Sequence, residues 1–330
     1  TVPAIEVLHP DELEQYTISE GGAFPRVAHG VATIQGSGTQ YDGHTVVLGG
    51  DGACGDFLCA TSTAPAYDVS YFKSGAIEFE EVFSQSLTFL GAEYLQLPDG
   101  RVGIVAGVDK SSSYISRPYL FEPATDSIVS SLPNESIALR EQTSATVMDP
   151  ITGAVLVVGG VGNEGLLEDA VVWTPDVASV PATGTLNEAR MRHTATRLPD
   201  NRVLIVGGAT GMQWNSAGVA LDSIETFNPS SETFSLENAV LTWPRMRHVA
   251  VGVEDEDNSV LLCGGATALD GPPVSACERY QPGDASISIL DGAPLAPGGE
   301  GMGHVVLADG RVLLFGGLAD GAPLDDIYLY

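Results

Sequence analysis

Arginine and histidine recur at a fixed spacing, Arg-x-x-His, and these pairs are the strongest candidates for chemistry in the sequence. The complete copies are Arg26/His29, Arg190/His193 and Arg245/His248, whereas Arg140 keeps only the arginine and His304 only the histidine. Guanidinium groups bind carboxylates through paired hydrogen bonds. A cluster of them predicts a site for a carboxylate or an acidic sugar, with candidate ligand-binding residues Arg26, Arg140, Arg190, Arg192, Arg245, Arg247, His193 and His248.

The same repetition supports a second interpretation. Each pair could brace its own strand or a neighbouring one by hydrogen bonds to backbone carbonyls and acidic side chains. A binding site usually departs from a repeat, whereas a brace recurs within it. Repetition therefore favours bracing and leaves anion binding open.

Four cysteines predict two local disulfide bonds. Cys263 ends a strand and Cys277 lies in the next strand of the same repeat, while Cys54 and Cys59 flank one short loop. Buried thiols and a zinc site are the alternatives, but zinc needs four converging ligands and these pairs lie in different repeats. Disulfides imply an oxidising compartment, and hence an extracellular or cell-surface protein.

Two kinds of loop residue are further candidates. Asp51 and Asp56 lie in the loop of the first cysteine pair and could bind calcium, the one cofactor that the sequence suggests. Trp214 fits no repeated position and, with Met212, lies in a polar loop, as Tyr114 does in another. Exposed aromatic residues on loops commonly contact a partner. These three are the candidate partner-binding residues, although each could instead fold back onto its own repeat.

Charge and composition exclude several classes of function. The chain has 330 residues, 14 Lys and Arg against 43 Asp and Glu, and a net charge of −29. Such a charge with no basic run excludes binding to nucleic-acid phosphates. No apolar run reaches the ~20 residues of a membrane helix. The sequence contains no His-Glu-x-x-His or Gly-x-Ser-x-Gly motif, so enzyme activity is left open without being favoured.

These residues are positioned by a repeat that covers the whole chain. An apolar strand ending in a pair of small residues recurs six times, with the first small residue at positions 49, 106, 159, 207, 264 and 316. A tight turn and another strand precede it. A third strand with an aromatic residue near its end follows, and then a weaker fourth strand. Units of about 50 residues with four antiparallel strands are typical of β-propeller blades.

The chain ends suggest how the blades close. Residues 4–29 align without a gap onto residues 223–248, so the N-terminal segment carries a third and a fourth strand. We predict an all-β fold of six four-stranded blades in a single domain over 1–330, with seven blades as an alternative because third strands are in surplus. The predicted blades are about 26–86, 87–139, 140–187, 188–243, 244–296, and 297–330 completed by 1–25.

The diglycine, the third-strand aromatic and the Arg-x-x-His pair together resemble the Kelch-repeat β-propellers. The resemblance covers essentially the whole chain and implies the propeller fold. It implies function only broadly, because the family includes scaffolds, binding modules and a few enzymes. The tyrosine, histidine and cysteine set of its copper-radical oxidases cannot be assembled here. The family also includes sugar-acid mutarotases, and the resemblance implies that these would use arginine and glutamate side chains at the mouth of the channel. Arg190, Arg245 and Glu93 are the residues of this sequence that could play those parts.

We therefore expect a secreted or cell-surface Kelch-type propeller that binds another protein or a surface glycan through its loops. One alternative is an enzyme or lectin that acts on acidic sugars at an arginine-lined channel mouth. Another is a subunit that assembles by strand exchange, in which an N-terminal strand completes the blade of a neighbouring copy.

Overall fold

The structure is a computed structural model. It describes residues 5–9, 14–18, 30–33, 36–39, 45–48, 68–72, 79–84, 91–108, 113–132, 140–211, 218–268, 271–290, 301–307, 309–315, 317–319, 322–323 and 327–330. Every regular element among these residues is a β-strand, which confirms the all-β prediction. The chain divides into two compact units: Thr1–Glu141 with Asp149–Ala154 and Trp173–Ser179, and Gln142–Met148 with Val155–Val172 and Val180–Tyr330. The single domain over 1–330 stays a prediction.

The first unit contains two four-stranded sheets and a hairpin. Blade 1 has the strand order β3 (Gly30–Thr33), β4 (Thr45–Leu48), β5 (Asp68–Phe72) and β6 (Phe79–Ser84). Blade 2 consists of β7 (Glu93–Gln96), β8 (Val102–Val105), β9 (Tyr119–Glu122) and β10 (Ser127–Ser130). The first strands β3 and β7 contact each other. The hairpin pairs β1 (Ile5–His9) with β2 (Glu14–Ile18).

Most residues of the other sheets belong to the second unit. Blade 3 consists of β11 (Ser144–Val147), β12 (Val155–Val158), β15 (Ala170–Thr174) and β16 (Val177–Pro181). Blade 4 consists of β17 (Thr194–Arg197), β18 (Val203–Val206), β21 (Ser223–Asn228) and β22 (Thr233–Val240). Blade 5 consists of β23 (Val249–Gly252), β24 (Val260–Cys263), β25 (Cys277–Gln281) and β26 (Ser286–Ile289). A sixth sheet has three strands, β27 (Gly303–Val306), β28 (Val312–Phe315) and β31 (Ile327–Leu329).

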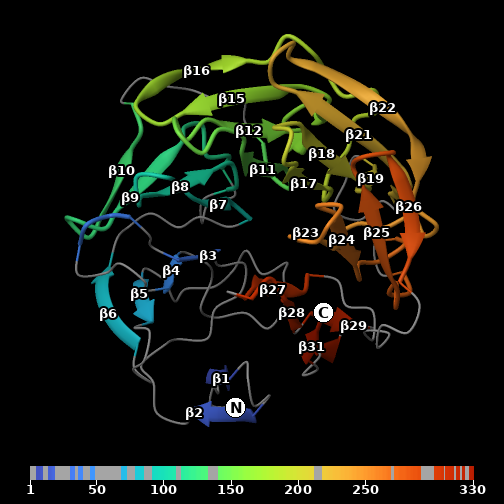
Figure 1. The fold of residues 1–330 in the computed structure, drawn as a ribbon. Coiled ribbons are helices and arrows are strands. Elements are labelled where there is room, and N and C mark those ends of the chain that lie inside the picture. The colour runs from blue at the N-terminus through green and yellow to red at the C-terminus, as the bar shows by residue number, and fades with distance from the viewer. Residues whose placement is uncertain are drawn as a thin grey trace. The chain divides into compact units, whose positions relative to one another are not determined.

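The first strands of the second unit also lie side by side, with β11 against β17, β17 against β23, and β23 against β27. In Figure 1, blades 4 and 5 can be followed from inner β17 and β23 to outer β22 and β26. Four antiparallel strands per sheet, with neighbouring first strands, is the blade arrangement of a β-propeller. The propeller prediction is thus confirmed.

The predicted blade count is not supported. The described strands form five complete four-stranded blades, and the sixth sheet has three strands rather than four. Residues 1–25 were expected to complete that sheet, but the described part of this segment forms a two-stranded sheet of its own. The pairing expected from the internal alignment is found within the hairpin: His9 pairs with Glu14 as Asn228 pairs with Thr233, 219 residues later.

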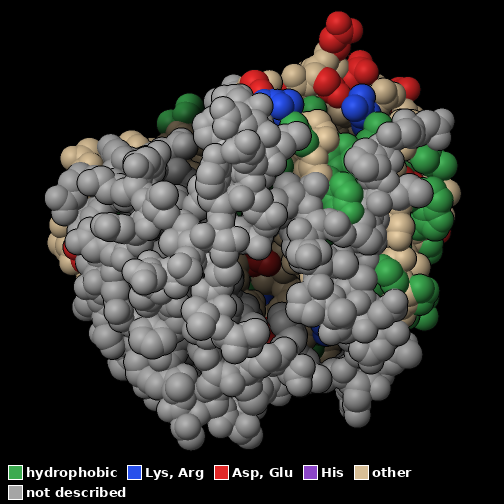
Figure 2. Space-filling model, turned by 90° about the horizontal axis from the view of Figure 1, so that it is seen from below, with side chains coloured by type: hydrophobic (Ala, Val, Ile, Leu, Met, Phe, Trp, Pro, Cys, Tyr) green, Lys and Arg blue, Asp and Glu red, His purple; other side chains and the backbone are tan. Residues whose placement is uncertain are grey.

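Short ribbons follow several glycine pairs. They are β13 (Val161–Gly162) with β14 (Gly165–Leu166), β19 (Ala209–Thr210) with β20 (Val219–Ala220), and β29 (Leu318–Ala319) with β30 (Ala322–Pro323). Outer strands β22 and β26 expose Leu236, Val240 and Ile289. On the described surface in Figure 2, hydrophobic side chains lie beside acidic and arginine ones.

The core lies between consecutive blades. Second strands β8, β12, β18 and β24 are runs of apolar residues or glycine, and all their residues are buried. The third-strand aromatic residue of each following blade packs against them. Phe227 packs with Leu156 of blade 3, and Tyr280 with Leu204 of blade 4. A large ring near the end of each third strand therefore fills the space between neighbouring sheets.

The glycine pair is required by the close approach of the next backbone. Both glycines of blade 4 have a positive φ, 57° at Gly207 and 94° at Gly208. A Cβ at Gly207 would lie 2.5 Å from the Arg245 carbonyl oxygen, and one at Gly208 would lie 2.7 Å from that of Met191. Glycine is the residue that tolerates this conformation and this approach. The diglycine and the Arg-x-x-His motif are thus two parts of one junction.

Candidate functional site

Arg190 is completely buried, and every donor of its guanidinium is used. Nε donates to the Glu188 carbonyl, Nη1 to the carbonyls of Gly207 (2.9 Å) and Ser223, and Nη2 to Ser223 Oγ and Glu225 Oε1 (2.7 Å). The Glu225 side chain is also fully buried. Its second oxygen accepts hydrogen bonds from the backbone and the amide of Asn187, both at 2.8 Å. Arg190 therefore joins all three inner strands of blade 4.

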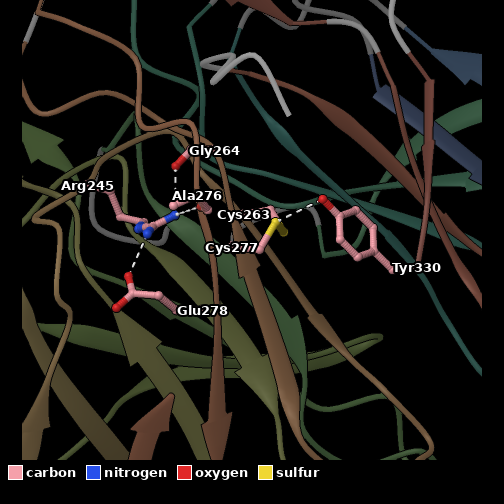
Figure 3. The surroundings of a disulfide bond; sticks show 7 residues. All are labelled: Arg245, Cys263, Gly264, Ala276, Cys277, Glu278 and Tyr330. Atoms are coloured by element: carbon pink, nitrogen blue, oxygen red, sulfur yellow. Dashed lines mark hydrogen bonds and ion pairs between the residues drawn. A yellow bond between two sulfur atoms is a disulfide. The ribbon is translucent and has the colours of Figure 1, made fainter. Parts of the chain in front are cut away.

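Arg245 repeats this arrangement in blade 5 (Figure 3). Nη1 donates to the carbonyls of Gly264 and Ala276, both at 3.0 Å, and Nη2 donates to Glu278 Oε2 at 2.5 Å. The other oxygen of Glu278 accepts from the backbone N–H of Thr242. Burial lowers the pKa of the Arg245 guanidinium, and the attraction of Glu278 opposes that shift. Both charges are held without contact with solvent.

The backbone at these arginines connects consecutive blades. The Arg245 carbonyl accepts a hydrogen bond from the N–H of Gly208 in blade 4 at 2.9 Å, and the Arg190 carbonyl accepts one from Gly160 in blade 3 at 2.8 Å. Each arginine thus braces its own blade with its side chain and holds the preceding blade with its carbonyl. This geometry favours the bracing interpretation for Arg190 and Arg245.

The histidines are buried in the same junctions. His248 Nε2 lies 2.9 Å from Thr194 Oγ1 of the preceding blade. A Cβ at Gly159 would lie 2.9 Å from His193 Cε1, so this ring lies against the glycine pair of the preceding blade. Burial lowers the pKa of His248 well below its usual value, and the nearby Arg245 and His193 lower it further. His248 is therefore neutral at physiological pH and acts as a packing group.

The register corrects one motif assignment. Gly303 pairs with Phe315 as Val249 pairs with Cys263, so Met302 occupies the position of His248. His304 lies two residues further, within β27, and is not an equivalent of the motif histidines. Methionine fills this position as an apolar packing residue, in keeping with the buried character of the site.

Arg140 is also fully buried, and its carbonyl accepts from the N–H of Gly107 in blade 2 at 3.0 Å. Blade 3 has Thr143 in the place of the histidine, and its hydroxyl donates to the Val158 carbonyl. Val171, two residues before Trp173, stands where blades 4 and 5 have Glu225 and Glu278. These two glutamates were missed by sequence reasoning. The sequence did contain a signal for them: both glutamates stand two residues before the third-strand aromatic residue, in blades with a complete Arg-x-x-His pair.

The remaining candidates are placed as follows. Arg192 and Arg247 precede the buried histidines, outside the buried pairs. Tyr114 is half-buried and forms an isolated bridge with Val108 in the loop of blade 2. The other candidates lie outside the described residues, namely Arg26, Asp51, Cys54, Asp56, Cys59, Met212 and Trp214. No group of three or more His, Cys, Asp or Glu in the described ranges could hold a metal ion.

The predicted disulfide between Cys263 and Cys277 is confirmed. The two residues are directly paired across β24 and β25, with a Cα–Cα distance of 4.2 Å. The hydroxyl of Tyr330 lies 3.3 Å from Cys277 Sγ (Figure 3). The bond therefore lies where the sixth sheet packs against blade 5.

Removal of this disulfide in Cys263→Ala/Cys277→Ala is expected to lower the free energy of unfolding by about 3 kcal/mol, the loss typical of a 15-residue loop. Urea denaturation of both proteins without reductant measures the difference. Adding a thiol reductant to the unfolded wild type before refolding should abolish most of it. Equal midpoints in the absence of reductant would contradict a stabilising bond.

Among the described acidic residues, Glu93 is the one whose pKa is raised to about 7. Burial at the start of β7 raises it from 4.5 to about 7. Between these values the folded state binds a proton that the unfolded state has released. Stability should therefore fall as pH rises through this window. We expect the wild type to lose stability relative to Glu93→Gln between pH 4.5 and 7, as followed by urea denaturation at several pH values. Parallel curves would refute the shift.

The fold and this site define a β-propeller whose blades are joined by repeated arginine, glutamate and glycine junctions. No protein-family model matches the chain, and no curated protein matches it. Within the described residues, no helix has the length and apolar character needed to cross a bilayer.

Proposed function

We propose that the chain is a Kelch-type propeller, secreted or displayed at the cell surface, that binds another protein through the loops after its glycine pairs. The observation that supports this most is the contrast between the two parts of each blade. The strands are fixed by buried ion pairs and backbone junctions, while the ribbons after the glycine pairs differ from blade to blade. Variable loops on a rigid scaffold are a common basis of recognition.

The ribbons offer both backbone and side-chain contacts. Asn163 and Glu164 are exposed at the turn between β13 and β14, and Val219 of β20 is 69% exposed. Val219 also bridges to Ala268 in the loop of blade 5, so neighbouring ribbons support each other. An exposed apolar residue on a supported ribbon is a suitable contact for a partner. Met212, Trp214 and Tyr114 are proposed as further partner contacts, each in the loop of its own blade.

The disulfide supports the proposed compartment. Cys263 and Cys277 are both buried, and such bonds persist in oxidising surroundings. A surface glycan is the other class of partner that suits an extracellular propeller. The test below distinguishes a glycan partner from a protein partner.

The test is a pull-down from an extracellular fraction with the disulfide-intact chain. The variants are Val219→Glu on a ribbon and, as a matched control, Ile151→Glu, which replaces another exposed apolar residue (88% exposed) in the turn between β11 and β12. A partner retained by the wild type and by Ile151→Glu, but lost from Val219→Glu, supports the proposal. Retention that survives protease treatment of the fraction indicates a glycan instead. Loss only from Ile151→Glu would place recognition at the turns.

A second candidate is assembly by strand exchange. Among the described strands, β31 is paired with β28 alone, whereas the third strands of the five complete blades each have a fourth strand beside them. The edge of a sheet can accept an extended strand from another chain. If a second copy supplies that strand from its N-terminal segment, deletion of residues 1–8 should convert oligomers to monomers in light scattering. A wild type that is monomeric at all concentrations would exclude this.

A further inference from the structure

The ribbon of β19 and β20 is held at both ends by the junction between blades 4 and 5. At its start, the N–H of Gly208 donates to the Arg245 carbonyl at 2.9 Å. At its end, the N–H of Arg245 donates to the Leu221 carbonyl at 3.1 Å, and the N–H of Leu221 donates to the Gly208 carbonyl at 2.8 Å. The position of the ribbon therefore depends on the segment of Arg245 staying against blade 4.

His248 packs into this junction. A Cβ at Gly207 would lie 3.2 Å from His248 Cε1, and one at Gly265 would lie 2.9 Å from His248 Cβ, so the residue lies against the glycine pairs of both blades. The Nε2 atom lies 2.9 Å from Thr194 Oγ1. The Nδ1 atom is buried and has no hydrogen-bond partner among the described residues. The junction thus suits an uncharged imidazole.

A proton on this ring would be disfavoured. Both nitrogens of an imidazolium are donors, so a buried Nδ1–H would be left unsatisfied. The charged and titratable groups that face the ring are Arg245 of its own segment and His193, which precedes β17; the guanidinium, and His193 when protonated, repel a positive charge. The nearby carboxylate of Glu278 is already held by Arg245 and the Thr242 N–H. Burial and the two facing groups hold the pKa of His248 well below its usual value of 6.5.

We propose that the junction of blades 4 and 5 is an acid-sensitive switch, in which protonation of His248 opens the junction and releases the ribbon of β19 and β20. At neutral pH the ring is uncharged and the ribbon is held. At acidic pH the open state gains population, because water solvates the imidazolium there. Since this ribbon belongs to the surface proposed to bind a partner, acidification would release that partner, a consequence that rests on the proposed function.

Amide hydrogen exchange tests the switch without a partner. A proton taken up by the open state alone makes opening about tenfold more favourable at pH 5.5 than at pH 7.5. We expect the protection factors of Gly208, Leu221 and Arg245, corrected for the intrinsic pH dependence of exchange, to fall about tenfold between these values. They should stay below those of amides within β18, which opening of the junction leaves covered. No fall, or protection equal to that of β18 at the acidic pH, would overturn the proposal.

Other blades supply the variants. His248→Met introduces the residue that stands at this position before β27, and His248→Thr introduces the one that blade 3 has there. Each removes the titrating ring, so protection at the junction should change less than about twofold between the two pH values. His304→Gln removes a histidine outside the junction and is the control, which should keep the fall seen in the wild type. If His248→Met does not fold, His248→Thr takes its place. A wild-type fall in a folded His248 variant would contradict the switch.

The pull-down described above, repeated at both pH values, separates this proposal from the proposed function. Acid release is supported by a partner that the wild type retains at the neutral pH and loses at the acidic pH, and that His248→Met retains at both. Retention by the wild type at both pH values would overturn acid release. A wild type that retains no partner at either pH would contradict the proposed function, and hydrogen exchange would still decide whether the switch exists.

Discussion

Arg245→Met is expected to lower the free energy of unfolding by about 3–5 kcal/mol, because it leaves the carboxylate of Glu278 buried without its cation. Both side chains of this pair are completely buried, so solvent cannot replace the lost partner. The carbonyls of Gly264 and Ala276 also lose their donor. Urea denaturation followed by circular dichroism measures the change.

A double variant separates the charge from the packing. Arg245→Met/Glu278→Leu removes both charges and should recover part of the loss, since an apolar pair has no ion to desolvate. An exposed pair provides the control: Arg202→Gln breaks the contact with Asp200 and should cost no more than ~1 kcal/mol. A single variant as mild as this control would show that Arg245 is not a brace.

Trp173→Ala is expected to destabilise the first unit by about 3–5 kcal/mol, the range for removing a large buried aromatic residue. The side chain is 0% exposed, and its ring lies over Gly103 of blade 2, where a Cβ would be 2.8 Å from Cζ3. Its indole N–H also donates to Ser131 Oγ at 3.2 Å. Thermal and urea denaturation give the size of the effect.

The contact between Trp173 and Gly103 can be tested from both sides. Gly103→Ala should destabilise the wild type by ~1–3 kcal/mol through overpacking. In the Trp173→Ala background the added methyl group enters the space that the ring has left, so the same substitution should cost less. Additive effects would mean that the two residues are not in contact as described.

The repeat was predictable because the backbone requires the same residue types at regular intervals along the sequence. Glycine is needed wherever the next blade approaches closely, and an aromatic residue wherever a third strand meets the preceding blade. The positions of Gly207 and Gly208 and of Phe227 and Tyr280 could therefore be read without a structure. The disulfide between Cys263 and Cys277 followed from the same register, since the two residues face each other across adjacent strands.

The site was harder to predict because its partners come from different strands. From the sequence alone, a glutamate in a strand, such as Glu225 or Glu278, is expected to be solvent-exposed. Its arginine partner stands 35 or 33 residues earlier in the chain and lies beside it only in the folded structure. His304 was assigned to the motif because spacing alone does not fix register. The blade count was not supported for a related reason: the pattern typical of a third strand occurs in both β1 and β31, but a pattern does not identify the sheet in which a strand pairs.

The junction between blades has a direction. One side supplies the N–H of the second glycine, and the other supplies the arginine carbonyl, so the contact is head-to-tail and identical in kind at Gly160–Arg190 and Gly208–Arg245. Contacts of this type behave as nearest-neighbour couplings in a linear array. Segments 140–187 and 188–243 carry matching halves at both ends. They should therefore be interchangeable as cassettes, and an evolving chain could duplicate or lose such a unit without inventing a new interface.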